Sequence, residues 1–194
     1  KKKKIKFVRF REPGGCKNSE RIRNLILNKS SNFKNLTDLL LYMASRNENY
    51  HELIKKNYNK KIILIDRFID STMAYQHYGM NINKNLILTL NKHILGKIDP
   101  DLTFLNIVNK KNLFQRLKKR DKKNRYDLFN YNFYKKVQNG FLKMANNNKK
   151  YIIIDSNESI SDNKSKIIQT INKLLKLWYS TQFNKKIYIQ WIII

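Results

Sequence analysis

Asp66-Arg67-Phe68-Ile69-Asp70-Ser71-Thr72-Met73-Ala74-Tyr75-Gln76 follows directly after the apolar run Ile62-Ile63-Leu64-Ile65. A short β-branched run that ends at charged residues is typical of a buried strand in a parallel sheet. In open α/β sheets, ligands bind just beyond the carboxyl ends of such strands. An acid, an arginine, two hydroxyls and a tyrosine gather at this point. The stretch therefore predicts a binding site for a polar, anionic ligand.

Length and composition fit a single domain with a real core. The chain has 194 residues, of which 41% are hydrophobic and 12% aromatic, enough to argue against disorder. One cysteine, Cys16, excludes an internal disulfide and fits a reducing compartment, so we expect a cytoplasmic location. No apolar run approaches the roughly 20 residues that span a bilayer. The lysine run at the start lacks the apolar segment of a signal peptide.

The charge of the chain is strongly positive. Lys and Arg number 41 against 14 Asp and Glu, which gives a net charge of +27. Such a balance is compatible with a basic nucleic-acid-binding protein. However, Lys, Asn, Ile, Tyr and Phe share A/T-rich codons and are frequent throughout, and the lysines form no single stripe. We therefore attribute the charge to composition, expect no specific nucleic-acid partner, and keep nucleic-acid binding as an alternative.

Patterns of strands and helices alternate along the chain. We expect strands at residues 5–10, 62–65, 102–107 and 151–154. We expect helices at residues 19–27, 36–58, from about 71, 83–95, 113–119, 131–145 and 164–178. Gly96 is expected to end the helix 83–95. This alternation predicts an α/β fold with a parallel sheet covered by helices on both faces, as one domain over residues 1–194.

Four short motifs occur in a particular order. They are Arg11-Glu12-Pro13-Gly14-Gly15, Glu20-Arg21-Ile22-Arg23, the stretch 66–76, and Pro100-Asp101-Leu102-Thr103. Together they resemble the bacterial thymidylate kinases, from about Phe7 to about Trp178. The resemblance implies the three-layer fold of the P-loop nucleoside monophosphate kinases. It also implies phosphorylation of dTMP to dTDP with ATP as co-substrate and Mg²⁺, in dTTP biosynthesis, and it suggests a homodimer.

The residues of the opening stretch take on roles through this resemblance. Arg67 offers a planar fork that suits a monophosphate, and the resemblance assigns it to the dTMP phosphate. Asp66 is implied to help organise the Mg²⁺ shell indirectly. Thr72 and Gln76 match positions near the base, and Tyr75 matches an aromatic residue near the sugar. Residues assigned to the loop that lines the phosphate and sugar are Arg11 and Glu12.

Tyr42 and Arg46 lie four residues apart in the long helix 36–58, so they share one face of it. An aromatic ring and an arginine in this arrangement can stack on a base and hydrogen-bond to its edge. Alone, such a pair is more often core packing and surface charge. The resemblance implies thymine recognition, with Tyr42 standing where the family usually has Phe. The added hydroxyl requires a hydrogen-bond partner.

A very basic connection spans residues 116–127 and matches the lid over ATP. Arg116, Arg120 and Arg125 are the candidate lid arginines, and Arg120 and Arg125 are those expected to complete the charge on the transferring phosphoryl group. The family often has Asp-Arg-x-Glu where this chain has Asn124-Arg125-Tyr126-Asp127. A solvated basic loop is the alternative interpretation of this segment.

No Gly-x-x-x-x-Gly-Lys-Ser/Thr motif occurs in the sequence. In the family this P-loop precedes the strand matched by residues 5–10. It supplies the phosphate cradle, the catalytic lysine, a Mg²⁺ ligand and the central strand of the sheet. Two explanations stay open: a shortened version of a complete enzyme, or a non-catalytic, nucleotide-binding remnant. The activity of this exact chain depends on which is correct.

An apolar extension at about residues 181–194 lies past the usual end of the family. Its last part, Lys186-Ile187-Tyr188-Ile189-Gln190-Trp191-Ile192-Ile193-Ile194, is strongly β-prone and too short to span a membrane. It could be read-through, an aggregation-prone tail or a dimer element. A further hypothesis is that it joins the sheet in the vacated central position, because an open sheet exposes unpaired edges.

Overall fold

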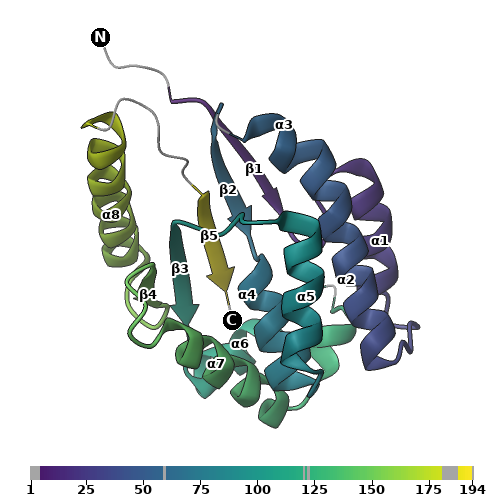
Figure 1. Cartoon of the computed structure of the whole chain (residues 1–194). Coiled ribbons are helices and arrows are strands. Elements are labelled where there is room, and N and C mark those ends of the chain that lie inside the picture. Colours follow the sequence, from purple (N-terminus) through teal and green to yellow (C-terminus); the bar gives the residue numbers. More distant parts are fainter. Residues whose placement is uncertain (1–4, 59, 120, 122, 181–187, 194) are drawn as a thin grey trace.

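The computed structural model describes residues 5–58, 60–119, 121, 123–180 and 188–193. Five parallel strands form one sheet in the order β1-β2-β5-β3-β4. The strands are β1 (Phe7–Arg11), β2 (Ile62–Asp66), β3 (Leu102–Ile107), β4 (Tyr151–Asp155) and β5 (Tyr188–Ile193). Figure 1 shows the arrows running in one direction, with helices around them. The predicted parallel α/β sheet is confirmed.

The helices follow the predicted alternation with small shifts at their ends. They are α1 (Lys17–Leu27), α2 (Asn35–Asn49), α3 (Lys55–Asn57), α4 (Ile69–Thr72), α5 (Lys84–Leu95), α6 (Lys110–Lys118), α7 (Tyr131–Ala145) and α8 (Ile160–Ser180). Two π-helical segments, η1 (Tyr50–Ile54) and η2 (Met73–Gly79), continue α2 and α4, and a 3₁₀ turn, η3 (Arg125–Leu128), precedes α7. Gly96 ends α5 with φ +63°, as expected. No described helix is both long and apolar enough to cross a bilayer.

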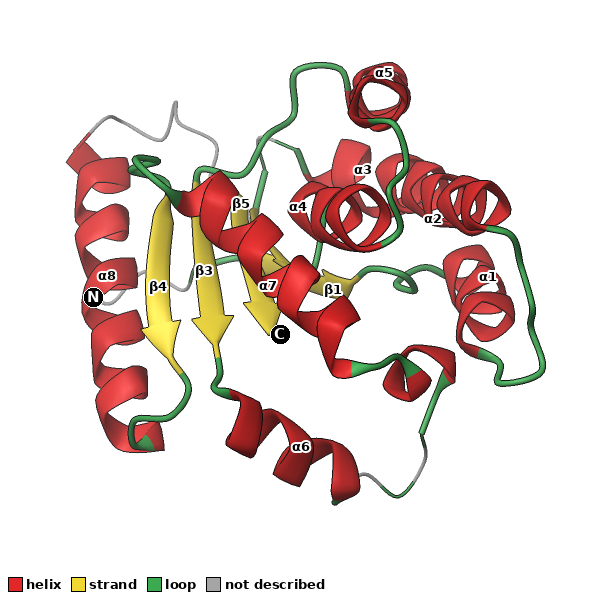
Figure 2. Cartoon of the chain, turned by 90° about the horizontal axis from the view of Figure 1, so that it is seen from below, coloured by secondary structure: helices red, strands yellow, loops and turns green. Residues whose placement is uncertain are grey.

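Alternate residues of the strands pack against helices on the two faces of the sheet. On one face, Phe104 and Ile154 pack with α8 through Ile167 and Ile171. On the other face, Leu105 packs with α7, while Ile63 and Ile65 pack with η1 and the end of α5. Figure 2 shows α7 crossing one face of β3 and β5, with α8 lying beyond β4. The sheet is therefore covered on both faces, which leaves the carboxyl ends of its strands for a site.

The central position of the sheet is occupied by β5. This strand runs parallel to both neighbours, with Leu64 opposite Ile189 on one side and Thr103 opposite Gln190 on the other. Ile189 and Ile192 are buried. The hypothesis that the apolar extension fills the central position is thus confirmed for residues 188–193. Residues 181–187 and Ile194 of the extension lie outside the described part of the chain.

Two amide side chains, through three hydrogen bonds, fix the register of β5. Gln190 is 1% exposed. In the amide orientation that satisfies both neighbours, its nitrogen donates to Asp70 Oδ2 at 2.9 Å and its oxygen accepts from the Phe68 N–H at 3.2 Å. On the opposite side, the Asn106 amide donates to the Ile192 carbonyl at 2.8 Å. A one-residue slip would move Gln190 to the other face of the sheet and break its pair of bonds. The strand is therefore specified by directional bonds as well as by apolar burial.

Candidate functional site

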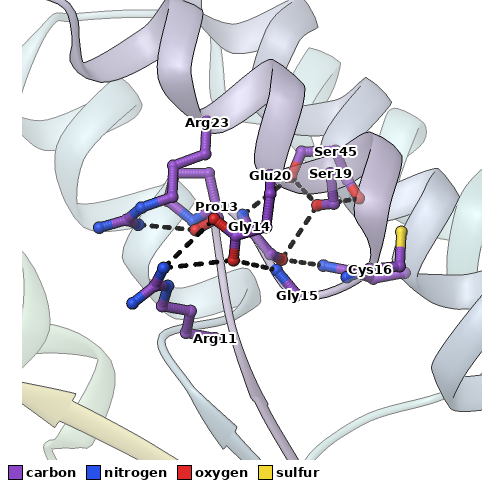
Figure 3. Close-up of polar contacts among 10 residues, drawn as sticks. Arg11, Pro13, Gly14, Gly15, Cys16, Ser19, Glu20, Arg23 and Ser45 are labelled. Atoms are coloured by element: carbon purple, nitrogen blue, oxygen red, sulfur yellow. Dashed lines mark hydrogen bonds and ion pairs between the residues drawn. The ribbon is translucent and has the colours of Figure 1, made fainter.

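The turn between β1 and α1 is held rigidly by polar contacts (Figure 3). Gly15 N–H donates to Glu20 Oε1 at 2.9 Å, and Arg23 donates to the Pro13 carbonyl at 2.7 Å. Gly14 and Gly15 have φ of +106° and +122°, and a Cβ on either would lie 2.6 Å from a side-chain oxygen. The turn therefore requires both glycines. It presents Glu12 and Arg23 on the side of the molecule where β2 ends.

Arg46 lies at the centre of a buried hydrogen-bond network. Its side chain is 1% exposed and donates to Glu12 Oε2 at 2.8 Å, to Thr72 Oγ1 at 2.9 Å and to Asn91 Oδ1 at 2.6 Å. Its guanidinium also lies over the Phe68 ring at 5.2 Å. Burial raises the pKa of Glu12 even though Arg46 opposes this. The predicted loop, helix and strand-end residues thus meet around one guanidinium.

Arg67 follows β2 directly and has the left-handed backbone φ of +63°. Its guanidinium lies 5.2 Å from the centroid of the Tyr75 ring, which belongs to η2. Burial disfavours its charge, but Tyr75 and Asp66 outweigh this effect and raise the pKa of Arg67. This strained backbone conformation directs the charged Arg67 guanidinium toward the helices at the carboxyl ends of the strands. Backbone strain of this kind is common at functional sites.

A pocket of about 240 Å³ lies at the carboxyl ends of β1 and β2. Cationic groups of Arg23, Arg46 and Arg67 line it, together with aromatic rings of Tyr42, Phe68 and Tyr75. Three of its other lining residues carry buried polar atoms that have no hydrogen-bond partner among the described residues. These atoms are Glu12 Oε1, Ser71 Oγ and Gln76 Oε1. Buried polar atoms normally find a partner, so these are available to a polar ligand.

Residues of the basic connection, which spans 116–127, also line the pocket. Arg116 on α6 lines the pocket and donates to the Ser156 carbonyl at 2.8 Å. Arg125 on η3 forms an ion pair with the buried carboxylate of Asp38 on α2. Tyr126 lines the pocket between these elements. Arg120 lies outside the described residues.

The structure brings together most of the predicted site residues. Those lining one pocket are Glu12, Tyr42, Arg46, Arg67, Thr72, Tyr75, Gln76 and Arg116. Arg11 instead pairs with Glu20 at 3.2 Å, with its side chain 51% exposed. Asp66 is exposed at the end of β2. Among the described residues, no group of three or more His, Cys, Asp or Glu side chains is arranged to hold a metal ion.

Sequence reasoning did not single out three residues that contribute to the site. Arg23 was part of a quoted motif without a role, although an arginine at i+3 from Glu20 points to the same turn. Asp38 looked like an ordinary acid in the first turn of a helix. Asn91 on α5 gave no local signal, because its partner Arg46 lies 45 residues away.

A parallel sheet with a cationic, aromatic-walled pocket at its carboxyl edge defines a nucleotide-binding protein of the α/β class. The family model for thymidylate kinase matches residues 1–167. The chain belongs to the thymidylate kinase family.

Curated relatives and a solved structure agree with this membership. The chain is 36% identical to a thymidylate kinase of Lactobacillus helveticus, over 90% of this chain and 84% of the relative. It is 39% identical to one of Mycoplasma capricolum, over 88% and 83%. The crystal structure of thymidylate kinase from Ehrlichia chaffeensis superposes with a TM-score of 0.67 at 32% identity, covering 86% of this chain and 80% of that one.

Proposed function

We propose that this protein phosphorylates dTMP to dTDP with ATP, and that the pocket at the ends of β1 and β2 is the dTMP site. The observation that carries the proposal is the combination of four arginines with five aromatic rings around one pocket in a thymidylate kinase family member. In the reaction, an oxygen of the dTMP phosphate forms a new bond to the γ-phosphorus of ATP. The bond from that phosphorus to the β,γ-bridging oxygen breaks, and ADP leaves.

The polar atoms of the pocket suit a pyrimidine base that carries an N–H. Gln76 Oε1 is buried and has no partner among the described residues, so it can accept a hydrogen bond from the base. Arg46 keeps one N–H, on Nη2, beyond those bound to Glu12, Thr72, Asn91 and the Met43 sulfur, and this N–H can donate to a base carbonyl. Tyr42 and Phe68 offer faces on which the base can stack.

The phosphate of dTMP suits the cationic side of the pocket. Arg67 and Arg23 can bind phosphate oxygens in the bidentate manner that guanidinium groups favour. Tyr75 contacts the Arg67 guanidinium and so keeps it in place, and we assign Tyr75 to the sugar side of the pocket. Arg11, one residue before Glu12, supports the turn through Glu20, and we assign it to the phosphate side of the loop.

The donor side of the reaction is assigned to the basic connection. Arg116 and Arg120 are proposed to contact ATP phosphates, because phosphoryl transfer relies on positioned positive charge. Asp66 is a single exposed carboxylate, which fits a Mg²⁺ ion held mainly by water and substrate phosphates rather than by a protein cage. When bound, Mg²⁺ would neutralise charge on the transferring phosphates. Arg125 is proposed to support this lid through its ion pair with Asp38.

The test is dTMP binding by calorimetry together with a coupled assay of ADP release. We expect Arg67→Ala to weaken dTMP binding about a hundredfold, because it removes a charged contact to the phosphate. Arg9→Ala, an exposed arginine on β1, is the matched control and is expected to leave binding unchanged. Equal binding of dTMP by the wild-type chain and Arg67→Ala would contradict the assignment.

Nucleotide binding without turnover is the alternative that the sequence left open, and a kinase assay separates it from the proposed reaction. The assay is therefore run on this chain and on the chain preceded by a segment that carries the motif. Turnover only with the added segment indicates a shortened enzyme. Binding without turnover in both indicates the non-catalytic protein. Salt-dependent DNA binding that is unaffected by Arg46 or Tyr42 variants would instead favour the nucleic-acid alternative.

Assembly and location are further parts of the proposal. A homodimer is the assembly that family membership suggests, and exposed leucines on α2, Leu36 and Leu40, are available to such an interface. Light scattering of the purified chain would test it. A cytoplasmic location is proposed because Cys16 is a free thiol, as expected in a reducing compartment.

A further inference from the structure

Asp38 is a buried carboxylate that binds two groups from a distant part of the chain. It lies on α2 and is 1% exposed. It accepts hydrogen bonds from the Arg125 guanidinium and the Tyr126 hydroxyl, which lie 87 and 88 residues further along. A buried carboxylate is costly unless it is paired and hydrogen-bonded. Asp38 therefore fixes the position of η3, a short turn that Figure 2 shows between α6 and α7.

The η3 turn is prepared to present Tyr126 at one orientation. Asn124 and Asp127 form a capping box in which the Asn124 side chain accepts from Tyr126 N–H at 2.8 Å. Tyr134 on α7 donates its hydroxyl to the Tyr126 carbonyl at 2.8 Å. The Tyr126 ring packs edge-on against Tyr42 and Tyr75, with centroids 6.3 Å and 5.8 Å away. Backbone and ring are thus held from both sides.

The direction of the hydrogen bond to Asp38 determines what the Tyr126 oxygen can do. An ionised carboxylate only accepts, so the single phenolic proton of Tyr126 points to Asp38. The Arg125 guanidinium and Gln76 Nε2, each 3.5 Å away, then donate to the Tyr126 oxygen. Burial and the Asp38 charge raise the pKa of the Tyr126 hydroxyl well above its usual value, so the phenol stays protonated.

The orientation of the Gln76 amide depends on the direction of the Tyr126–Asp38 hydrogen bond. Its Nε2 lies 3.5 Å from the Tyr126 hydroxyl, and its Oε1 is buried in the pocket lining without a partner among the described residues. With the Tyr126 oxygen available only as an acceptor, the Gln76 amide directs its nitrogen to Tyr126. Its carbonyl oxygen is then left for the ligand. A flipped amide would present a donor instead.

We infer that Asp38 and Tyr126 act as positioning residues that set the orientation of the Gln76 amide, and that this relay selects pyrimidine nucleotides with an N–H at position 3 of the base. Asp38 accepts from Tyr126, Tyr126 accepts from Gln76, and Gln76 accepts from the base. Thymine has a donor at position 3, whereas cytosine has an acceptor there. The inference rests on the proposed function, because it concerns the base of the same nucleotide.

The experiment compares dTMP and dCMP binding by calorimetry in the wild-type chain, Tyr126→Phe, Asp38→Asn and a control. Tyr126→Phe removes the hydroxyl but keeps the ring, so the Gln76 amide can rotate. We expect the preference for dTMP over dCMP to fall about tenfold, which is the discrimination one buried hydrogen bond supplies. Asp38→Asn is expected to give a smaller fall, because an amide can still accept from Tyr126. Asp121→Asn, an exposed acid in the same connection, should leave the preference unchanged.

The ratio of the two affinities separates positioning from a general structural role. A variant that merely loosens the pocket weakens both nucleotides equally and leaves the ratio where it was. Ratios within twofold of the wild-type value in both variants would overturn the relay. Failure of the wild-type chain to bind dTMP would overturn the proposed function instead. Tyr126→Phe keeps the Asp38–Arg125 ion pair, so it supplies the result where Asp38→Asn, which removes the counter-ion of Arg125, does not fold.

Discussion

The pocket around Arg46 and the position filled by β5 are held by different kinds of interaction, although β2 borders both. In the pocket, Arg46 and Glu12 are buried charges whose positions depend on hydrogen bonds of fixed direction. In the sheet, Ile189 and Ile192 are buried apolar side chains, supplemented by the Gln190 amide. A directional network specifies one ligand geometry, whereas apolar burial in a parallel sheet accepts many β-branched sequences. Loss of β5 should therefore abolish the fold, whereas changes in the pocket should weaken binding and lower stability by a limited amount.

The largest effect is expected when β5 is removed. A chain ending at Ser180 would leave β2 and β3 without the strand that pairs with both of them. Two exposed edges and an uncovered core should abolish cooperative unfolding and promote aggregation. Thermal melts by circular dichroism and size-exclusion chromatography measure this. A cooperative melt and normal dTMP binding by the shorter chain would show that β5 is dispensable.

Arg46→Ala tests the pocket side of the comparison. Removing one partner of a buried ion pair leaves Glu12 uncompensated, so we expect a loss of about 3–5 kcal/mol in the free energy of unfolding. Binding of dTMP should be lost as well, because Thr72 and Asn91 also lose their partner. Urea unfolding and calorimetry measure the two effects. Arg21→Ala, an exposed arginine on α1, serves as the control, and equal stability of the two variants would contradict the network.

The two regions also differ in how far the sequence predicts them. Local signals were sufficient for β2 and for Arg67, because a β-branched run followed by charge is typical of a strand end. The pairing of Arg46 with Asn91, and of Asp38 with Arg125, joins residues 45 and 87 positions apart and leaves no local pattern. The place of β5 was open because its apolar run fits a tail, an interface or a strand equally well. Its position depends on β2 and β3 leaving room for one strand between them, which is a property of the assembled sheet and not of any local sequence.

Asp70 follows β2 near the pocket and contacts Gln190 of β5, and its titration makes the stability of the fold depend on pH. Burial raises its pKa from 3.8 to about 6, with Asp99 adding to the effect, while Tyr151 and Lys150 oppose it. The folded state then binds a proton more tightly than the unfolded state, so this group's contribution to stability falls as pH rises from 3.8 to about 6. The fall is at most about 3 kcal/mol.

The measurement is urea unfolding of the wild-type chain and Asp70→Asn between about pH 3.5 and about pH 7, a range that includes both the unfolded pKa of 3.8 and the folded pKa of about 6. Subtracting the two curves removes the contributions of the other carboxyl groups. We expect the free energy of unfolding of Asp70→Asn to rise relative to that of the wild-type chain as pH rises. The variant keeps an amide beside Gln190 and carries no buried charge there. A difference that does not change with pH would contradict the raised pKa.

The smallest effect is expected from Tyr42→Phe, which removes one hydroxyl from the pocket wall. The Tyr42 ring lies edge-on to Tyr126, and burial raises the pKa of the Tyr42 hydroxyl, so the hydroxyl stays protonated. Tyr126 retains its bond to Asp38, so the loss should be about 1 kcal/mol or less in stability. Binding of dTMP should change less than about threefold, because the ring that stacks on the base remains. Tyr42→Ala, which removes the ring as well, should weaken binding far more in the same titration. Equal effects of the two variants would mean that the hydroxyl, rather than the ring, makes the contact with the nucleotide.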